Sequence, residues 1–199
     1  MKKRIFIAIN LSEKVRKRLK EYQEKTKDLF TRRSFSGGGP VRWTKIPSLH
    51  ITLVFIGYVD NEQMLEACKI AREMAGKADP FFINFKRISF GPIGNAPRMI
   101  WLEMVANQEL DDLKKKLEEA LVSKDTGLQK VENRPFSPHI TLARLKMEQW
   151  REAQINPAEV EQDFKVQFEV SSIEVMESDL KFDGAEYATL ESCPLGEES

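Results

Sequence analysis

The chain has 199 residues, of which 41 % are hydrophobic and 31 % are charged, a composition typical of a soluble globular protein. Its 31 Lys and Arg residues balance its 31 Asp and Glu residues, which argues against a broadly basic surface that coats long nucleic acid. A local basic pocket for one phosphate or one RNA end remains compatible with that balance. The apolar run from Ile5 to Ile9 is too short for a signal sequence or a membrane span, and no other run reaches membrane length. We therefore expect a cytoplasmic protein with reduced thiols at Cys68 and Cys193.

Strand-like and helix-like segments alternate along the chain. In chain order, the apolar periodicity predicts a strand at 4–9, a helix capped by Ser12, strands at 41–44 and 48–56, a helix capped by Asn61, strands at 81–90 and 98–105, a helix with its apolar stripe at 110–121, and strands at 136–145, 164–170, 173–177 and 187–190. Along the second helix we place Leu65, Cys68 and Ala71 on the buried face. A glycine-rich loop, Ser36 to Pro40, interrupts the pattern. About three long helices and seven or more strands indicate the α+β class.

The two histidines of the chain both begin the same tetrapeptide, His50-Ile51-Thr52-Leu53 and His139-Ile140-Thr141-Leu142. Side chains alternate between the two faces of a strand, so each histidine shares a face with the threonine two residues later. Two such strands lying side by side bring both imidazoles and both hydroxyls to one cleft. The two motifs lie in different halves, each with several strands and at least one helix. We therefore expect a duplicated unit arranged about a pseudo-two-fold axis.

A pair of imidazoles suits phosphoryl chemistry near neutral pH. One ring can remove a proton from attacking water, the other can protonate the leaving alkoxide, and the threonine hydroxyls can donate to phosphate oxygens. The sequence has no HExxH motif, no Walker loop and no carboxylate cluster beside either histidine. Two histidines without a third ligand also make a poor zinc site. We expect no metal and no cofactor, and a small strained cyclic phosphodiester as the target.

The motifs and their flanks resemble the two-histidine (2H) phosphoesterase superfamily, in its RNA 2′,3′-cyclic phosphodiesterase branch, historically also called 2′-5′ RNA ligase. One HxTx motif alone is a weak signal, whereas two with matching flanks are a strong one. The matching flanks are Arg4–Ile9, Val41-Arg42-Trp43, Phe55-Ile56-Gly57, Arg134-Pro135-Phe136-Ser137-Pro138, Ala143-Arg144, and Met176-Glu177-Ser178 with Gly184 and Tyr187.

The resemblance implies a bilobal fold in which two antiparallel-rich sheets flank a central cleft with the helices outside, built as a single domain over 1–199. It implies hydrolysis of RNA 2′,3′-cyclic phosphate ends to 2′-phosphomonoesters, with the 3′ oxygen as the leaving group. Carried over by motif position, the resemblance also implies that His50 is the general acid and His139 the general base, and that Thr52 and Thr141 hold the phosphate. The acid–base order comes from the family resemblance, because the sequence itself is symmetric on that point.

Four further residues are candidates for substrate binding. Arg134 and Arg144 could clamp phosphate, and the alternative is that they form surface ion pairs. Strand alternation puts Arg144 on the face opposite Thr141, which counts against its direct contact with the phosphate. Phe136 and Trp43 could stack on a nucleobase, and the alternative is that they fill the core.

Two other functions compete with cyclic phosphodiester hydrolysis. A binding module would hold nucleotides or RNA without turnover. Ligation of tRNA halves through a 2′-5′ bond would use a 5′-hydroxyl in place of water, and we treat it as a side activity. The expected partners are RNA with a 2′,3′-cyclic phosphate end, including tRNA halves, or cyclic nucleotides. We expect a monomer that does not associate with membranes.

Overall fold

The structure, a computed structural model, describes residues 2–31, 39–92, 97–123, 128, 136–181 and 184–196. Its strands are β1 Lys3–Asn10, β2 Val41–Trp43, β3 His50–Val59, β4 Phe81–Gly91, β5 Met99–Met104, β6 His139–Leu145, β7 Gln162–Val170, β8 Ser172–Lys181 and β9 Gly184–Pro194. Its helices are α1 Glu13–Thr31, α2 Asn61–Gly76, α3 Gln108–Leu121 and α4 Met147–Ala153, with 3₁₀ turns η1 Ile46–Ser48 and η2 Pro157–Glu159. No helix in these ranges is long and apolar enough to cross a membrane.

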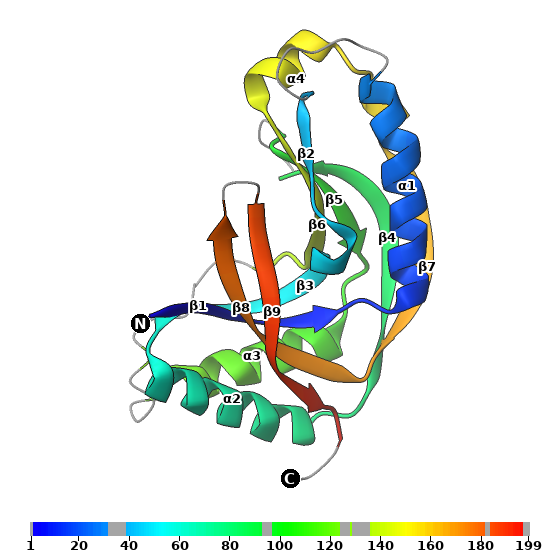
Figure 1. Cartoon of the computed structure of the whole chain (residues 1–199). Helices are drawn as coiled ribbons and strands as arrows, with labels where there is room; N and C mark the ends of the chain where they lie inside the picture. Colours follow the sequence, from blue (N-terminus) through cyan, green and yellow to red (C-terminus); the bar gives the residue numbers. More distant parts are fainter. Residues whose placement is uncertain are drawn as a thin grey trace.

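The described strands form two antiparallel sheets, one in the order β3-β1-β8-β9 and one in the order β2-β6-β5-β4-β7 (Figure 1). The predicted α+β class with two antiparallel sheets is confirmed. The first sheet corresponds strand by strand to β6-β5-β4-β7 of the second. In each, the connection between the first two neighbours runs through a helix, α1 between β1 and β3 and α3 between β5 and β6. Both HITL motifs therefore lie at equivalent places, which supports the predicted duplication.

The helices cover the outer faces of the sheets and link the two halves. The sheet with β1 and β3 is covered by α2, and α3 packs against α2 and β3. The apolar stripe of α3 is buried as the periodicity predicted, and it consists of Leu110, Leu113, Leu117 and Leu121. In contrast, α1 connects strands of the first sheet but packs on the second, along β4 and β7 (Figure 1). The predicted placement of the helices outside the sheets is confirmed.

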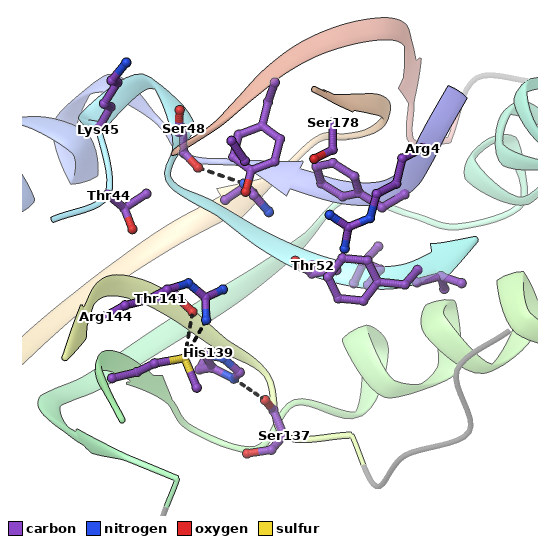
Figure 2. A pocket seen from close by; sticks show the side chains of 18 of the residues that line it. Arg4, Thr44, Lys45, Ser48, Thr52, Ser137, His139, Thr141, Arg144 and Ser178 are labelled. Carbon is purple, nitrogen blue, oxygen red and sulfur yellow. Dashed lines mark hydrogen bonds between the residues drawn. The ribbon is translucent and has the colours of Figure 1, made fainter. Parts of the chain in front are cut away.

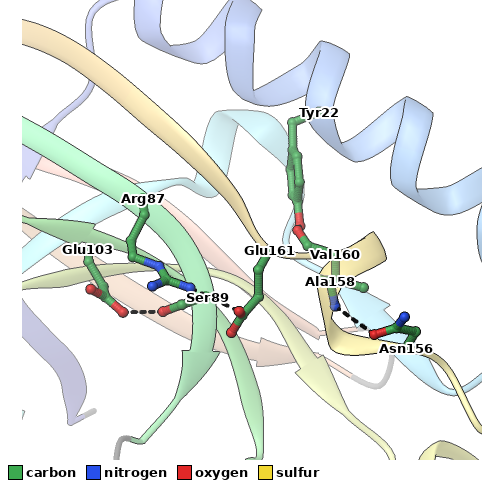
Figure 3. Close-up of polar contacts among 8 residues, drawn as sticks. All are labelled: Tyr22, Arg87, Ser89, Glu103, Asn156, Ala158, Val160 and Glu161. Carbon is green, nitrogen blue, oxygen red and sulfur yellow. Dashed lines mark hydrogen bonds and ion pairs between the residues drawn. The ribbon is translucent and has the colours of Figure 1, made fainter.

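Polar contacts anchor α1 to the second sheet (Figure 3). The Tyr22 hydroxyl donates a 2.9 Å hydrogen bond to the carbonyl oxygen of Val160, just before β7. Burial raises the pKa of Tyr22, so the phenol remains a donor at any physiological pH. Within the second sheet, Arg87 Nη2 on β4 lies 2.9 Å from Glu161 Oε2. This ion pair joins β4 to the turn that precedes β7.

Several details of the elements differ from the predictions. The cap of α2 is Asp60, not Asn61, because Asp60 and Gln63 form a capping box: Gln63 N donates to Asp60 Oδ1 at 2.9 Å, and Asp60 N donates to Gln63 Oε1 at 3.1 Å. Leu65 is 65 % exposed, since Ala67, Cys68, Ile70, Ala71 and Ala75 form the buried face of α2. The strands predicted from 48 and 136 begin at the histidines instead. Helix α4 was not predicted.

Candidate active site

Both histidines occupy the same local position, the first residue of a strand, and make the same contact. His50 Nδ1 lies 2.8 Å from the Ser48 carbonyl oxygen, and His139 Nδ1 lies 2.7 Å from the Ser137 carbonyl oxygen (Figure 2). A carbonyl oxygen only accepts, so Nδ1 carries the hydrogen in both rings. The Nε2 atom of each neutral imidazole is then the one that can exchange a proton with a substrate.

The two histidines and the two motif threonines line one cleft of about 820 Å³ between the sheets. Figure 2 shows Thr52 on the β3 side of this cleft, with Thr141 and His139 on the β6 side. Strands β3 and β6 contact each other across it. The volume lies in the upper part of the range of about 300–1,000 Å³ for small-molecule sites.

Aromatic side chains enclose each imidazole. The His50 ring centroid lies 5.0 Å from that of Phe6 and 5.0 Å from that of Tyr187, with the Tyr187 ring edge-on. The His139 ring stacks on Trp101, with centroids 3.9 Å apart and planes inclined by 23°. These contacts fix both ring orientations and remove water from one side of each ring. Trp101, Phe6 and Tyr187 were not singled out from the sequence as site residues.

Burial lowers the pKa of both histidines, because it disfavours the charged imidazolium. The hydrogen bonds to the carbonyls of Ser48 and Ser137 act in the opposite direction. For His139 alone, the positive charge of Arg144 lowers the pKa further. The two motifs are thus alike in geometry but differ in charge environment, and His139 is the histidine that Arg144 biases toward its neutral form.

Each HITL motif contains a β-bulge at its leucine. The pairing register of β3 with β1 skips Leu53, and the register of β6 with β5 skips Leu142. The skipped residue and its successor, Val54 or Ala143, are both buried. A bulge inserts one residue and so reverses the alternation of side chains beyond it.

The bulges overturn the predicted orientation of Arg144. Strand alternation placed this side chain away from Thr141, whereas the structure places it in the cleft, because the extra residue at Leu142 reverses the parity. The equivalent residue of the first motif, Phe55, also lines the cleft and is 41 % exposed.

Thr141 and Arg144 point at the same sulfur atom. Thr141 Oγ1 lies 3.9 Å and Arg144 Nη1 lies 3.6 Å from Met99 Sδ (Figure 2). A thioether is a weak acceptor, so an anionic phosphate oxygen would bind both donors much more strongly. The structure therefore brings a hydroxyl and a guanidinium, both hydrogen-bond donors, together next to His139.

The bulge of β6 is held from behind by α1. Gln23 is 2 % exposed, and its Nε2 donates to the carbonyl oxygens of Thr44 at 3.0 Å and Leu142 at 3.4 Å. The backbone N–H of Thr44 also donates to the Leu142 carbonyl oxygen, at 2.9 Å. These bonds satisfy the backbone that the bulge removes from the regular ladder.

The remaining predicted residues are placed as follows. Trp43 lines the cleft, but its ring also packs edge-on against Tyr22 and Phe30, with centroids 6.2 Å apart in both cases. Phe136 lines the cleft below Lys114, whose Nζ lies 5.0 Å from the ring centroid. Arg134 lies outside the described residues, as does most of the Ser36 to Pro40 loop.

The cleft is positively charged although the chain has no net charge. Among the described lining residues five are cationic and one is anionic: Arg4, Arg42, Lys45, Lys114, Arg144 and Glu118. Lys114 belongs to a run of three lysines on α3, and its side chain is only 12 % exposed. Its Nζ pairs with Glu118 at 2.5 Å. The excess of positive charge favours an anionic ligand.

Comparison with known proteins agrees with this geometry. The sequence pattern described as the 2′-5′ RNA ligase superfamily matches residues 11–181. The chain belongs to the 2′-5′ RNA ligase superfamily. The family resemblance inferred from the two HITL motifs and their flanks is therefore confirmed.

Among relatives in the superfamily, an RNA 2′,3′-cyclic phosphodiesterase of Bacillus subtilis (strain 168) is 37 % identical over 103 residues, which cover 52 % of this chain and 55 % of that protein. One from Thermus thermophilus is 28 % identical over 197 residues, 96 % of this chain and 90 % of that protein. The matches span about half or less of the first three curated relatives. The crystal structure of the Thermus thermophilus protein TT0787 superposes with a TM-score of 0.76 and 26 % identity, and the match covers 98 % of this chain and 100 % of that one.

Proposed function

We propose that this protein hydrolyses 2′,3′-cyclic phosphate ends of RNA to 2′-phosphomonoesters by two-histidine acid–base catalysis, without a metal ion. One observation carries the proposal. Two imidazoles, each held through Nδ1 by a carbonyl oxygen two residues earlier, line a single positively charged cleft. The relatives that bear the name RNA 2′,3′-cyclic phosphodiesterase support the same reaction.

In the proposed reaction, His139 Nε2 takes a proton from water as the water oxygen bonds to phosphorus. The bond between phosphorus and the 3′ oxygen breaks, and His50 Nε2 gives its proton to that oxygen. This order requires a neutral His139 and a protonated His50. The charge of Arg144, which lowers the pKa of His139 and is not among the causes acting on His50, favours this assignment.

In this proposal, Thr141 and Arg144 donate to the non-bridging oxygens from one side of the phosphorus, and Thr52 donates from the other. The bound anion itself favours protonation of one imidazole, which offsets the effect of burial. A 5′-hydroxyl of a second RNA in place of water would give a 2′-5′ bond. Water at about 55 M outcompetes such an acceptor, so ligation is a side reaction of the same groups.

Because each sheet contributes one histidine, we infer that residues 1–199 act as one functional domain. From the sequence alone, we propose that the protein is a cytoplasmic monomer. Its proposed substrates are RNA ends, tRNA halves or cyclic nucleotides.

The test is turnover of an oligonucleotide with a 2′,3′-cyclic phosphate end in the presence of a chelator, with the 2′- and 3′-phosphate products resolved by chromatography. The proposal expects 2′-phosphate with an undiminished rate after chelation. Equilibrium binding of the same oligonucleotide with no product after hours would identify a binding module instead.

A further inference from the structure

A row of side chains from the neighbouring strands β1, β8 and β9 lines the cleft beside His50. Ser178 on β8 pairs with Tyr187 on β9. Arg4 on β1 stands one position beyond the Ile5–Glu177 pair, so the antiparallel register places it opposite Ser178. Arg4, Ser178 and Tyr187 all line the cleft, and the Tyr187 ring contacts the His50 ring. The row is therefore adjacent to the proposed reaction centre, and Figure 2 shows Arg4 and Ser178 on the same side as Thr52.

Ser178 has an unsatisfied hydroxyl. The residue is 8 % exposed, and its Oγ has no hydrogen-bond partner within the described part of the chain. Buried polar atoms in native proteins are nearly always paired, because an unpaired one loses its bonds to water without compensation. The unpaired hydroxyl of Ser178 is explained if a ligand bound in the cleft is its hydrogen-bond partner.

Arg4 has an uncompensated charge in the same place. Across the described ranges no carboxylate pairs with it, and its recorded contact is with the Phe55 ring, whose centroid lies 6.0 Å from the guanidinium carbon. The preceding residue, Lys3, has the opposite arrangement: its Nζ pairs with Glu177 at 2.8 Å. Strand alternation directs these two neighbours to opposite faces, so only the cation on the cleft face lacks a counter-ion.

A guanidinium and a hydroxyl next to the Tyr187 ring, which contacts His50, provide two donors for a second anion. In the proposed reaction, the cyclic phosphate occupies the donors around His139, namely Thr141 and Arg144. In an RNA strand the next anion is the phosphodiester on the 5′ side of the terminal nucleoside, and a free nucleoside 2′,3′-cyclic phosphate lacks it. We propose that Arg4 and Ser178 bind this 5′ phosphodiester, so that the site selects RNA ends over free cyclic nucleotides. The inference rests on the proposed function, since it places the reacting phosphate between the histidines.

The experiment compares kcat/KM for adenosine 2′,3′-cyclic phosphate with that for a dinucleotide ending in the same group. We expect the wild-type protein to prefer the dinucleotide about tenfold or more, as a charge-assisted hydrogen bond allows. Arg4→Gln lowers this preference about tenfold, Ser178→Ala about threefold, and Arg4→Lys less than Arg4→Gln. Lys3→Gln is the matched control on the opposite face, and it leaves the preference unchanged. The preference also weakens with salt, with a slope near 0.7 on a double-logarithmic plot for one phosphate of a single strand.

Equal rate losses on both substrates in Arg4→Gln, or a wild-type protein without preference, would overturn the second site while leaving the proposed hydrolysis intact. If neither substrate is hydrolysed, the proposed function fails and binding decides the inference. Adenosine 3′,5′-bisphosphate should then bind more tightly than adenosine 3′-phosphate in the wild-type protein, and Arg4→Gln should remove the difference. Equal affinities for the two nucleotides would rule out the second site independently of catalysis.

Discussion

Replacing Gly91 with alanine tests how His139 is held. Gly91, on β4, pairs with Met99 on the neighbouring strand β5 and lies diagonal to Trp101, so a Cβ at this position would overlap the indole ring. The ring must move, and it stacks directly on His139. Overpacking of this kind costs about 1–3 kcal/mol, and about 2–4 °C of Tm follows per kcal/mol in a chain of this length. We therefore expect Gly91→Ala to lower Tm by about 2–12 °C.

The same substitution should lower kcat, because a displacement of a catalytic group by about 1 Å can cost about a hundredfold in rate. Circular dichroism measures Tm, and turnover of a 2′,3′-cyclic phosphate end measures kcat. The background Trp101→Leu separates the two effects. There the added methyl group meets a smaller side chain, so Gly91→Ala should cost less stability than in the wild-type protein, while kcat stays low because the stack on His139 is gone.

A Gly91→Ala protein with wild-type Tm and wild-type kcat would refute this reasoning. It would show that the indole can move without disturbing His139. The stack would then have no role in orienting the imidazole.

Three further predictions concern the same elements. Burial lowers the pKa of His50 and His139 below the unfolded value of about 6.5, so the unfolded chain binds more protons and the free energy of unfolding falls as pH drops below about 6.5. Urea titrations at pH 7.5 and 5.5 measure this loss, and it should shrink when both histidines are replaced with glutamine. Gln23→Leu removes the side-chain donor of the part-buried Thr44 carbonyl, while the Leu142 carbonyl keeps its bond from Thr44 N–H. It should destabilise the protein by about 1–2 kcal/mol in urea unfolding, whereas Glu21→Gln on the exposed face of the helix should have no effect. Arg144→Met should lower kcat/KM about 10- to 150-fold, equivalent to about 1.5–3 kcal/mol, and Arg144→Lys should restore part of it because lysine keeps the charge but not the planar fork. A lower kcat/KM in Arg144→Lys together with an unchanged kcat/KM in Arg144→Met would contradict a role of Arg144 in binding phosphate.

The regular parts of the fold were predictable because periodicity reports burial directly. The stripe of α3 and the alternation of β7 are read from single segments, and the two HITL motifs identify their own strands. The exchange of helices between the halves was not predictable, since no local pattern tells which sheet α1 covers.

The prediction failed for Arg144 for a specific physical reason. Counting by twos along a strand assumes an unbroken period, and one extra residue reverses every later side chain. The adjacent apolar pairs Leu53-Val54 and Leu142-Ala143 were the available signal, because a strand with one polar face rarely has two consecutive buried residues.

Arg4 and Ser178 stand in the flanks that resemble the family, but neither they nor Trp101 were predicted as site residues, for a different reason. Each is a single residue in a strand, and its role depends on which strand lies beside it. Pairing between β1 and β8 joins residues more than 160 positions apart in the chain, and no local sequence pattern records that pairing.

The central claim, that His50 protonates the leaving 3′ oxygen and His139 activates water, can be tested directly with a bridging sulfur. A 2′,3′-cyclic phosphate with sulfur in place of the 3′ oxygen has a leaving group that departs as a thiolate and needs no general acid. On the oxygen substrate, His50→Ala and His139→Ala should each lose about 10²–10⁴-fold in rate. On the sulfur substrate, His50→Ala should recover most of its rate and His139→Ala should not. Recovery in His139→Ala instead, or full activity of either variant on the oxygen substrate, would contradict the account.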